Sequence, residues 1–187
     1  MGNLALLFSI LISSSAFALE FGDILLQPLK CWSCSLIEQQ ENSDYSHMGL
    51  YIGDDQVAEA FAGGVKIVSL EEFKQKTDPL RSISVRRLKS LPPYFETRLM
   101  SELSLYLGRP YDRWFSWEGS EIYCSELVFK VLAPLVHFED LSPKPMLFDQ
   151  NTEYWDRYFR GQTPRGELGI SPGDFELSSD FETVESI

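Results

Sequence analysis

The chain has 187 residues, of which 44% are hydrophobic and 13% aromatic, enough for one domain with a substantial core. It carries 28 Asp and Glu against 16 Lys and Arg, which gives a net charge of −12. A surface this acidic repels phosphate groups, so nucleic acid and anionic membrane are excluded as favoured partners. Three cysteines and two histidines exclude a disulfide-dense mini-fold and leave few ligands for a soft metal.

Residues 1–18 have the pattern of a secretory signal peptide. Leu4–Ile12 is almost entirely apolar, and Ala16 and Ala18 are the small residues expected before a cleavage site, although no Lys or Arg precedes the run. The run is too short to span a bilayer, and a buried N-terminal helix is the alternative interpretation. We expect cleavage after Ala18, which leaves residues 19–187 as a single exported domain, periplasmic or secreted, with no transmembrane anchor.

The first half of that domain predicts mostly strands. Strand patterns cover residues 24–26, 47–53, 56–61, 65–68 and 82–88, with turns at 53–55 and 63–64. Residues 32–40 are compatible with a helix or a loop. Ser69 and Glu72 have the spacing of a capping box at the start of a short helix.

Two longer helices are expected in the second half. Apolar residues every four positions after Pro92-Pro93 predict a helix that runs through Leu107 and stops at Gly108. A second helix is expected from Cys124 to Leu132. The chain is then aromatic and irregular, with a turn into a strand at 172–175 and the last ten or so residues partly disordered. This order of elements indicates an α+β fold rather than regular βαβ alternation.

Three positions carry candidate chemistry. Cys124 starts a helix, where the helix dipole lowers a thiol pKa, although a small buried filler is an equal interpretation. His47 begins a strand and is one of only two histidines. Glu59 lies in the apolar strand at 56–61, where a carboxylate is unusual unless it is paired or the strand edge faces water.

A thiol, an imidazole and a carboxylate together form a known nucleophilic set. The imidazole takes the thiol proton, and the acid orients the ring and fixes its tautomer. Amide cleavage then passes through a thioester, with backbone N–H groups at the start of the cysteine helix available to hold the oxyanion.

The hairpin register decides whether His47 and Glu59 share a face. A two-residue turn at Asp54-Asp55 puts them on opposite faces. A three-residue loop, 53–55, pairs Ile52 with Gln56 and sets Glu59 opposite a glycine and diagonal to His47. We therefore expect an odd-length loop, both side chains directed toward Cys124, and room for the carboxylate above the glycine at position 49.

Five blocks in this order resemble the YiiX-like proteins, which are circularly permuted relatives of the NlpC-type papain-fold cysteine peptidases. The blocks are Phe21–Leu26, Tyr45–Gly53, Val57–Ala60, Leu107–Asp112 and Tyr123–Leu127, with a weaker echo at Ser171–Asp174. The permuted group places the histidine and the acid before the cysteine, as here. The resemblance implies a permuted papain-like fold with an antiparallel sheet packed against helices. It also implies Cys124 as nucleophile, His47 as base, Glu59 as orienting acid, and amide hydrolysis in cell-wall peptides or lipid-linked amides without a cofactor.

Two other functions remain open. The lecithin–retinol acyltransferase-like proteins share the permuted arrangement and move fatty acyl groups, so acyl transfer or ester and thioester hydrolysis is the main alternative. Those proteins usually carry Asn-Cys at the nucleophile, whereas this chain has Tyr123-Cys124, and it lacks their C-terminal membrane anchor. An inactive papain-fold binding module is the second alternative, and retention of all three candidate residues weighs against it.

The remaining cysteines form Cys31-Trp32-Ser33-Cys34. The spacing is that of thioredoxin-type redox sites, but a simple disulfide is the preferred interpretation in an exported protein. A zinc site made of Cys31, Cys34, His47 and Cys124 would consume the catalytic pair, so we expect no metal.

Aromatic residues near the nucleophile suggest a substrate groove for a peptide, a peptidoglycan fragment or an acyl lipid. The candidates are Tyr111, Trp114, Trp117 and Tyr123, and at least one of the tryptophans is expected to be core.

Overall fold

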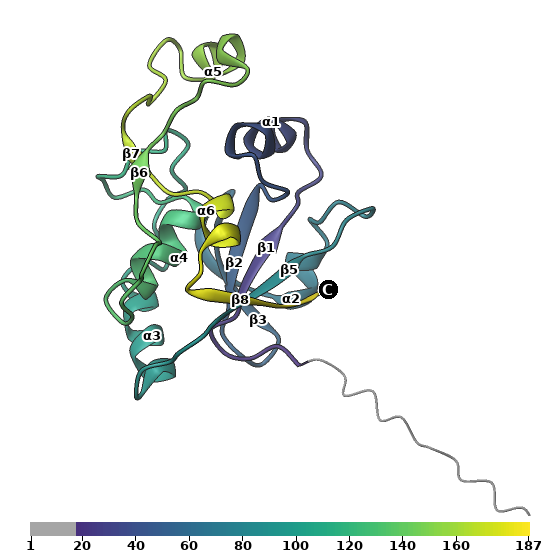
Figure 1. Cartoon of the computed structure of the whole chain (residues 1–187), viewed down its shortest axis with the longest axis vertical. Helices are drawn as coiled ribbons and strands as arrows, with labels where there is room; N and C mark the ends of the chain where they lie inside the picture. The colour runs from purple at the N-terminus through teal and green to yellow at the C-terminus, as the bar shows by residue number, and fades with distance from the viewer. Residues whose placement is uncertain (1–17) are drawn as a thin grey trace, which may run out of the picture.

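The computed structural model describes residues 18–187. The predicted signal peptide, except Ala18, lies outside the described residues, and its cleavage stays a prediction. The described part contains a six-stranded antiparallel sheet with helices on both sides (Figure 1). This arrangement confirms the α+β prediction.

The large sheet has the strand order β4-β3-β2-β1-β5-β8. Its strands are β1 (Ile24–Gln27), β2 (His47–Tyr51), β3 (Gln56–Phe61), β4 (Gly64–Ser69), β5 (Ser84–Leu88) and β8 (Phe181–Ser186). A separate pair joins β6 (Lys144–Pro145) and β7 (Leu168–Gly169). The helices are α1 (Trp32–Glu41), α2 (Leu70–Lys74), α3 (Phe95–Ser104), α4 (Cys124–Leu132), α5 (Thr152–Tyr158) and α6 (Pro172–Leu177).

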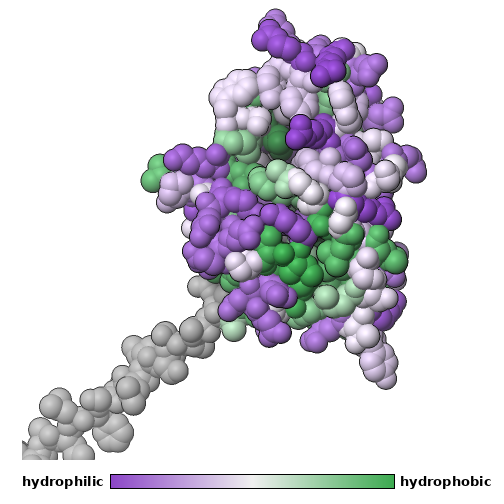
Figure 2. Space-filling model, turned by 180° about the vertical axis from the view of Figure 1, so that it is seen from behind, coloured by the Kyte–Doolittle hydropathy of each residue, from purple (hydrophilic) through white to green (hydrophobic). Residues whose placement is uncertain are grey.

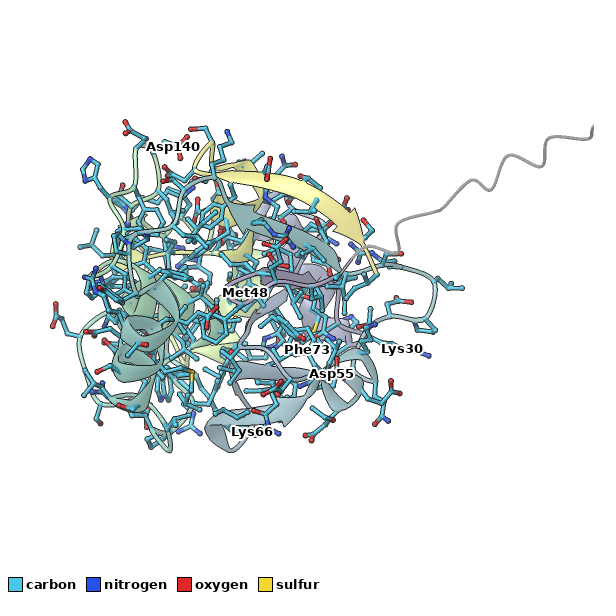
Figure 3. The ribbon with its side chains drawn as sticks, turned by 90° about the horizontal axis from the view of Figure 1, so that it is seen from below. Lys30, Met48, Asp55, Lys66, Phe73 and Asp140 are labelled. Atoms are coloured by element: carbon cyan, nitrogen blue, oxygen red, sulfur yellow. A yellow bond between two sulfur atoms is a disulfide. The ribbon has the colours of Figure 1, made fainter. Side chains whose placement is uncertain are left out.

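Both faces of the sheet are buried, because successive side chains of a strand point to opposite faces. Met48 and Leu50 belong to the larger core, which also contains the apolar residues of α3 and α4. Figure 1 shows these two helices together on one side of the sheet. On the other face, Val57 packs with Phe73 of α2 in a smaller core (Figure 3 labels Met48 and Phe73, one from each core). Figure 2 shows that polar groups cover much of the rear surface, with one contiguous apolar area in its lower half.

The β2–β3 hairpin has the predicted register. Leu50 pairs with Ala58 and Tyr51 with Val57, and the Ile52 N–H donates to the carbonyl oxygen of Gln56 over 3.0 Å. The loop therefore has three residues, 53–55, with φ values of +83°, +48° and +53°. A glycine and two aspartates tolerate this left-handed region better than most residues. The register sets His47 and Glu59 on one face.

Gly49 has a different role from the expected one. A Cβ built on Gly49 would lie 2.6 Å from Val57 Cγ1 and 2.8 Å from Phe73 Cε2. The missing side chain therefore makes room for the ring of Phe73, not for the carboxylate of Glu59. Phe73 can in consequence pack directly over the strand that carries His47.

Three boundaries in the second half differ from the sequence expectations. Helix α3 ends at Ser104, so Leu107 lies beyond it and is exposed, because the chain tightens into turns before Gly108. Residues 172–177 form helix α6 rather than a turn into a strand, since Ser171 accepts the N–H of Asp174 and caps it. The acidic end, expected to be partly disordered, forms β8 and pairs with β5 at the sheet edge.

The expected capping box at Ser69 is half formed. Ser69 Oγ accepts the N–H of Glu72 over 3.1 Å. The Glu72 carboxylate does not return to the cap, because it bonds Lys66 Nζ instead.

Residues 31–41 form helix α1 and its cap rather than a loop. Cys31 is the N-cap, its sulfur accepts the N–H of Cys34, and the two cysteines form a disulfide. The disulfide fixes the first turn of a helix that packs, through Leu36, against Phe148 and Trp155. Segments more than 100 residues apart in the chain are thereby brought together near the start of β2.

Candidate active site

Cys124 is the first residue of α4 and the one free cysteine in the chain. It is 5% exposed. Glu126 stabilises the start of the helix by accepting the N–H of Tyr123 and a hydrogen bond from Lys130. The thiol thus lies at the positive end of the helix dipole, in a helix turn held by its own side chains.

His47 and Glu59 are in direct contact on the α2 face of the sheet. His47 Nε2 and Glu59 Oε2 are 2.8 Å apart, and the residues are 1% and 0% exposed. A carboxylate only accepts, so the ring donates its Nε2–H. This tautomer leaves Nδ1 as the nitrogen available to take a proton from Cys124.

The charges of this group shift two pKa values in opposite directions. Burial alone lowers the pKa of His47, but hydrogen bonds to Cys124 and Glu59, and their charges, outweigh it and raise the pKa above its ordinary value. Burial alone raises the pKa of Glu59, yet the hydrogen bond and charge of His47, followed by those of Lys76, lower it below its ordinary value. The arrangement therefore favours an imidazolium beside a carboxylate.

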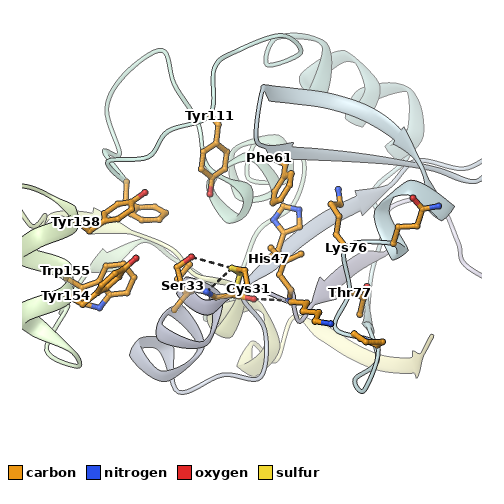
Figure 4. A pocket seen from close by; sticks show the side chains of 18 residues that line it. Cys31, Ser33, His47, Phe61, Lys76, Thr77, Tyr111, Tyr154, Trp155 and Tyr158 are labelled. Carbon is orange, nitrogen blue, oxygen red and sulfur yellow. Dashed lines mark hydrogen bonds between the residues drawn. A yellow bond between two sulfur atoms is a disulfide. The ribbon is translucent and has the colours of Figure 1, made fainter.

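Two lysines approach the other oxygen of Glu59. Lys76 Nζ donates a hydrogen bond to Glu59 Oε1, and Lys66 Nζ lies 3.9 Å from the same atom. The Lys76 ammonium also lies over the rings of Phe61 and Phe73, 4.7 and 5.1 Å from their centroids. Both rings contact the imidazole of His47 as well. Figure 4 shows His47, Phe61 and Lys76 side by side.

Two neighbouring pockets open beside these residues. The first, of about 670 Å³, is lined by His47, Lys76 and the Cys31–Cys34 disulfide. Figure 4 shows Tyr154, Trp155 and Tyr158 across this pocket from His47. The second, of about 530 Å³, is lined by Cys124 with its neighbours Tyr123 and Ser125, and by residues from α1 and from the segments at 144–148 and 169–174. The pockets share Ile37, Ser46, Tyr111, Phe115 and Trp155.

The second pocket has mainly apolar walls near Cys124. They include Ile37, Phe115, Met146, Phe148, Trp155 and Ile170. Three charged residues line it as well. Lys144 forms an ion pair with Asp174, and burial raises the pKa of Glu41. The Cys124 thiol thus faces a pocket whose walls are mainly hydrophobic.

Two of the four predicted groove residues line these pockets. Tyr111 lines both, and Tyr123 lines the second, where its hydroxyl accepts the N–H of Ile170. Trp117 lines neither pocket; it is partly buried and packs against Phe129 at the edge of the larger core, so it is not a fully buried core residue as expected. Trp114 also lies outside both; it is 45% exposed, and its ring lies 6.2 Å from that of Phe159.

Sequence reasoning missed most of the pocket wall. Phe115 and Phe148 come from loops, Trp155 and Tyr158 come from α5 in a region expected to be irregular, and Ile37 comes from α1. The density of aromatic residues between 148 and 159 was the available signal. Lys76 was missed as well, and no local pattern marks it.

The fold and the site define a class of protein. A helix that begins at a free cysteine packs on an antiparallel sheet, and that sheet carries a histidine–carboxylate pair, in the chain order histidine, acid, cysteine. The family described as permuted papain-like amidase enzyme, YaeF/YiiX, C92 family, matches residues 18–184. The chain belongs to this family, and its fold is the permuted papain-like fold that the sequence blocks implied.

Two relatives support the assignment. The chain is 33% identical over 136 residues to the uncharacterized protein YiiX of Escherichia coli (strain K12), which covers 70% of this chain and 67% of that protein. It also resembles the crystal structure of metalloprotein yiiX from Escherichia coli O157:H7, with a TM-score of 0.80 and 25% identity, over 90% of this chain and 97% of that one. Within residues 18–187, no helix has the length and hydrophobicity needed to cross a membrane.

Proposed function

We propose that this protein is a cysteine amidase in which Cys124 is the nucleophile, His47 the general base and acid, and Glu59 the residue that orients His47. Membership of a permuted papain-like amidase family supports amide hydrolysis at the level of reaction class. The observation that carries the residue assignment is the buried His47–Glu59 contact of 2.8 Å, together with the Cys124 hydrogen bond that raises the pKa of His47.

The first half of the proposed reaction forms a thioester. His47 Nδ1 takes the thiol proton, and the Cys124 sulfur attacks the amide carbonyl carbon, so that a C–S bond forms and the oxygen becomes anionic. Backbone N–H groups in the first turn of α4 stabilise that oxyanion. The intermediate collapses, the C–N bond breaks, and the imidazolium returns its proton to the departing amine.

The second half of the proposed reaction regenerates the thiol. Water attacks the thioester carbon while His47 removes one of its protons, the C–S bond breaks to release the carboxylic acid, and the imidazolium returns that proton to the Cys124 sulfur. Glu59 holds one ring orientation throughout and stabilises the imidazolium in both halves.

The two pockets suggest how the substrate lies. Cys124 faces the second pocket, so the acyl half of the substrate lies there, against its apolar walls. His47 faces the first pocket, so the amine that receives its proton leaves on that side. Apolar walls around the acyl half favour a lipid-linked amide over a cell-wall peptide, because a hydrophobic chamber gains free energy by burying an acyl chain.

The zinc site considered from the sequence is not formed among residues 18–187. The crystal structure that this chain resembles is that of a metalloprotein, yiiX. Here Cys31 and Cys34 are bonded to each other, so they are not available as ligands beside His47 and Cys124. Among residues 18–187, no group of three or more His, Cys, Asp or Glu side chains is placed to hold a metal ion. No step of the proposed reaction passes through a metal.

Substrate turnover tests the proposal. The purified domain is incubated with peptidoglycan fragments, N-acyl lipids and lipoprotein peptides, and the released amine and acid are quantified. Wild type is expected to hydrolyse an N-acyl lipid, Cys124→Ala to be inactive, and Cys124→Ser to lose at least about 10³-fold. Rapid quenching and intact-mass measurement are expected to detect an acyl group on Cys124.

Other outcomes of the same assay would overturn parts of the proposal. Acyl transfer to an added alcohol or amine, with little free acid, would make the protein an acyltransferase. Hydrolysis that survives Cys124→Ala would rule out Cys124 as the nucleophile. The absence of an acyl adduct with every substrate class would favour a binding module. Export is part of the proposal as well, and absence of the protein from the periplasmic or secreted fraction of expressing cells would contradict it.

A further inference from the structure

We propose that Lys76 is a positioning residue of the active site, a fourth member that acts through Glu59 to hold the thiolate–imidazolium pair of Cys124 and His47. This inference rests on the proposed function, because it concerns the same reaction. It adds a residue outside the cysteine, histidine and acid set. The pH range over which Cys124 reacts then depends on Lys76, although Lys76 forms and breaks no covalent bond in the reaction.

The Glu59 carboxylate bridges two cations through different oxygens. Oε2 accepts from His47 Nε2, and Oε1 accepts from Lys76 Nζ. Glu59 is fully buried, so water cannot replace either partner without opening the fold. The carboxylate can therefore adopt its observed orientation only while both oxygens keep these partners.

The charges of the active state balance only when Lys76 is included. A Cys124 thiolate, a His47 imidazolium and a Glu59 carboxylate sum to one negative charge. The Lys76 ammonium brings the buried set to neutrality. An uncompensated buried charge is strongly unfavourable, so without Lys76 the set returns to neutrality by keeping the thiol protonated or by protonating Glu59.

Packing holds Lys76 in place. Its ammonium lies over Phe61 and Phe73, the same rings that flank His47. The Lys76 side chain is 19% exposed, whereas the Lys66 side chain is 40% exposed and bonds Glu72 over 3.1 Å. Lys66 thus provides a matched control, a second lysine near the same oxygen that is more hydrated and already paired.

Few other charged groups face this cluster. From β4 comes Lys66, from α2 comes Glu72, and from α4 comes Cys124 itself. Tyr111 and Lys30 line the same pocket as His47. Burial lowers the pKa of Lys76, and its hydrogen bond to Glu59 opposes that change. Among these groups Lys76 is the cation hydrogen-bonded to the orienting carboxylate.

The test measures the rate of Cys124 alkylation by iodoacetamide, a neutral reagent, between pH 4 and pH 10. It needs no substrate. Wild type is compared with Lys76→Met, Lys76→Gln, Lys76→Arg and the control Lys66→Met, and far-ultraviolet circular dichroism checks that each is folded. Lys76→Gln preserves a hydrogen-bond donor without the charge, so it remains informative if Lys76→Met does not fold.

The acid limb of the profile is the pH range over which the alkylation rate of Cys124 rises with pH. In Lys76→Met and Lys76→Gln we expect this limb to shift to higher pH by about one unit, so that the rate at pH 5 falls about tenfold. Lys76→Arg should retain the wild-type limb, and Lys66→Met should move it by less than about 0.3 unit, because an exposed charge is screened. A merely structural role would reduce the stability or the plateau rate without moving the limb.

Two results would overturn the inference. One is a folded Lys76→Met or Lys76→Gln protein with the wild-type limb, and the other is an equal shift in Lys66→Met. Failure of the proposed function has a separate signature, because wild type would then show no low-pH thiolate and no loss of reactivity in His47→Ala. If wild type shows a low-pH thiolate and His47→Ala loses reactivity, but the Lys76 variants behave like wild type, then only the role of Lys76 is refuted.

Discussion

The two sides of the active site are built from different kinds of structure. His47 and Glu59 lie on neighbouring strands whose register is fixed by a three-residue loop, and both are fully buried. The opposite wall consists of α1 and the segment around α5, which meet through Leu36, Phe148 and Trp155. The proposed reacting groups are thus on rigid elements, and the surfaces that would select a substrate are on loops and short helices, which tolerate change more readily.

The first prediction sharpens this comparison on the strand side. Glu59→Gln should reduce kcat by roughly 10²-fold or more with little change in KM, because the amide no longer stabilises the imidazolium or enforces its tautomer. Steady-state kinetics on the best substrate measures both constants. Undiminished turnover in Glu59→Gln would mean that another group orients His47.

The second prediction concerns pH. Since the pKa of His47 is raised, the imidazolium should persist above its ordinary titration midpoint near pH 6.5. The profile of kcat/KM should be bell-shaped, with an alkaline limb above about pH 6.5, beyond which activity falls about tenfold per pH unit. In Glu59→Gln that limb should move to lower pH. An alkaline limb at or below the ordinary histidine value in wild type would contradict the charge arrangement.

The third prediction tests the wall. Ile37 lines both pockets and is only half-buried, so Ile37→Ala should remove substrate contact at little cost in folding. We expect KM to rise about 5- to 10-fold while kcat stays within about twofold. Leu80→Ala is the control, because Leu80 is 92% exposed and lies outside both pockets. A fall in kcat alone in Ile37→Ala would contradict the assignment of substrate binding to the wall formed by α1 and the segment around α5.

The fourth prediction has the smallest expected effect on chemistry. Replacing both Cys31 and Cys34 with alanine should lower the free energy of unfolding by about 2 kcal/mol, because a short loop is no longer closed and the start of α1 loses its cap. Urea denaturation measures this. The alkylation rate of Cys124 should stay within about threefold of wild type. A large loss of Cys124 reactivity would show that the wall also positions the nucleophile.

The strand side of the site is predictable from the sequence, whereas the wall formed by α1 and the segment around α5 is not. The loop at 53–55 predicts the hairpin register, and a helix starting at Cys124 follows from local spacing. Both depend on residues close together in the chain. Gly49 could not be interpreted correctly, since the ring that fills its space comes from α2, more than 20 residues away.

Most of the pocket wall depends on long-range packing. Phe148 and Trp155 face α1 only because the chain returns across the molecule, and no periodicity near them indicates a partner. Lys76 is 17 residues from Glu59 and lies after a short helix, so nothing local marks it as the partner of a buried carboxylate. The acidic composition of residues 181–186 predicts a disordered end, whereas these residues form β8, because pairing with the distant strand β5 orders them.

The most direct test of the central claim is the rate at which iodoacetamide modifies Cys124 at pH 6, followed by peptide mapping, in wild type and in His47→Ala. We expect a single modified cysteine per chain, since the other two form a disulfide. We also expect wild type to react at least about tenfold faster than His47→Ala, because the thiolate is the reactive form and the neighbouring imidazole is the base that accepts the thiol proton. Equal rates in the two proteins would contradict the claim that His47 activates Cys124.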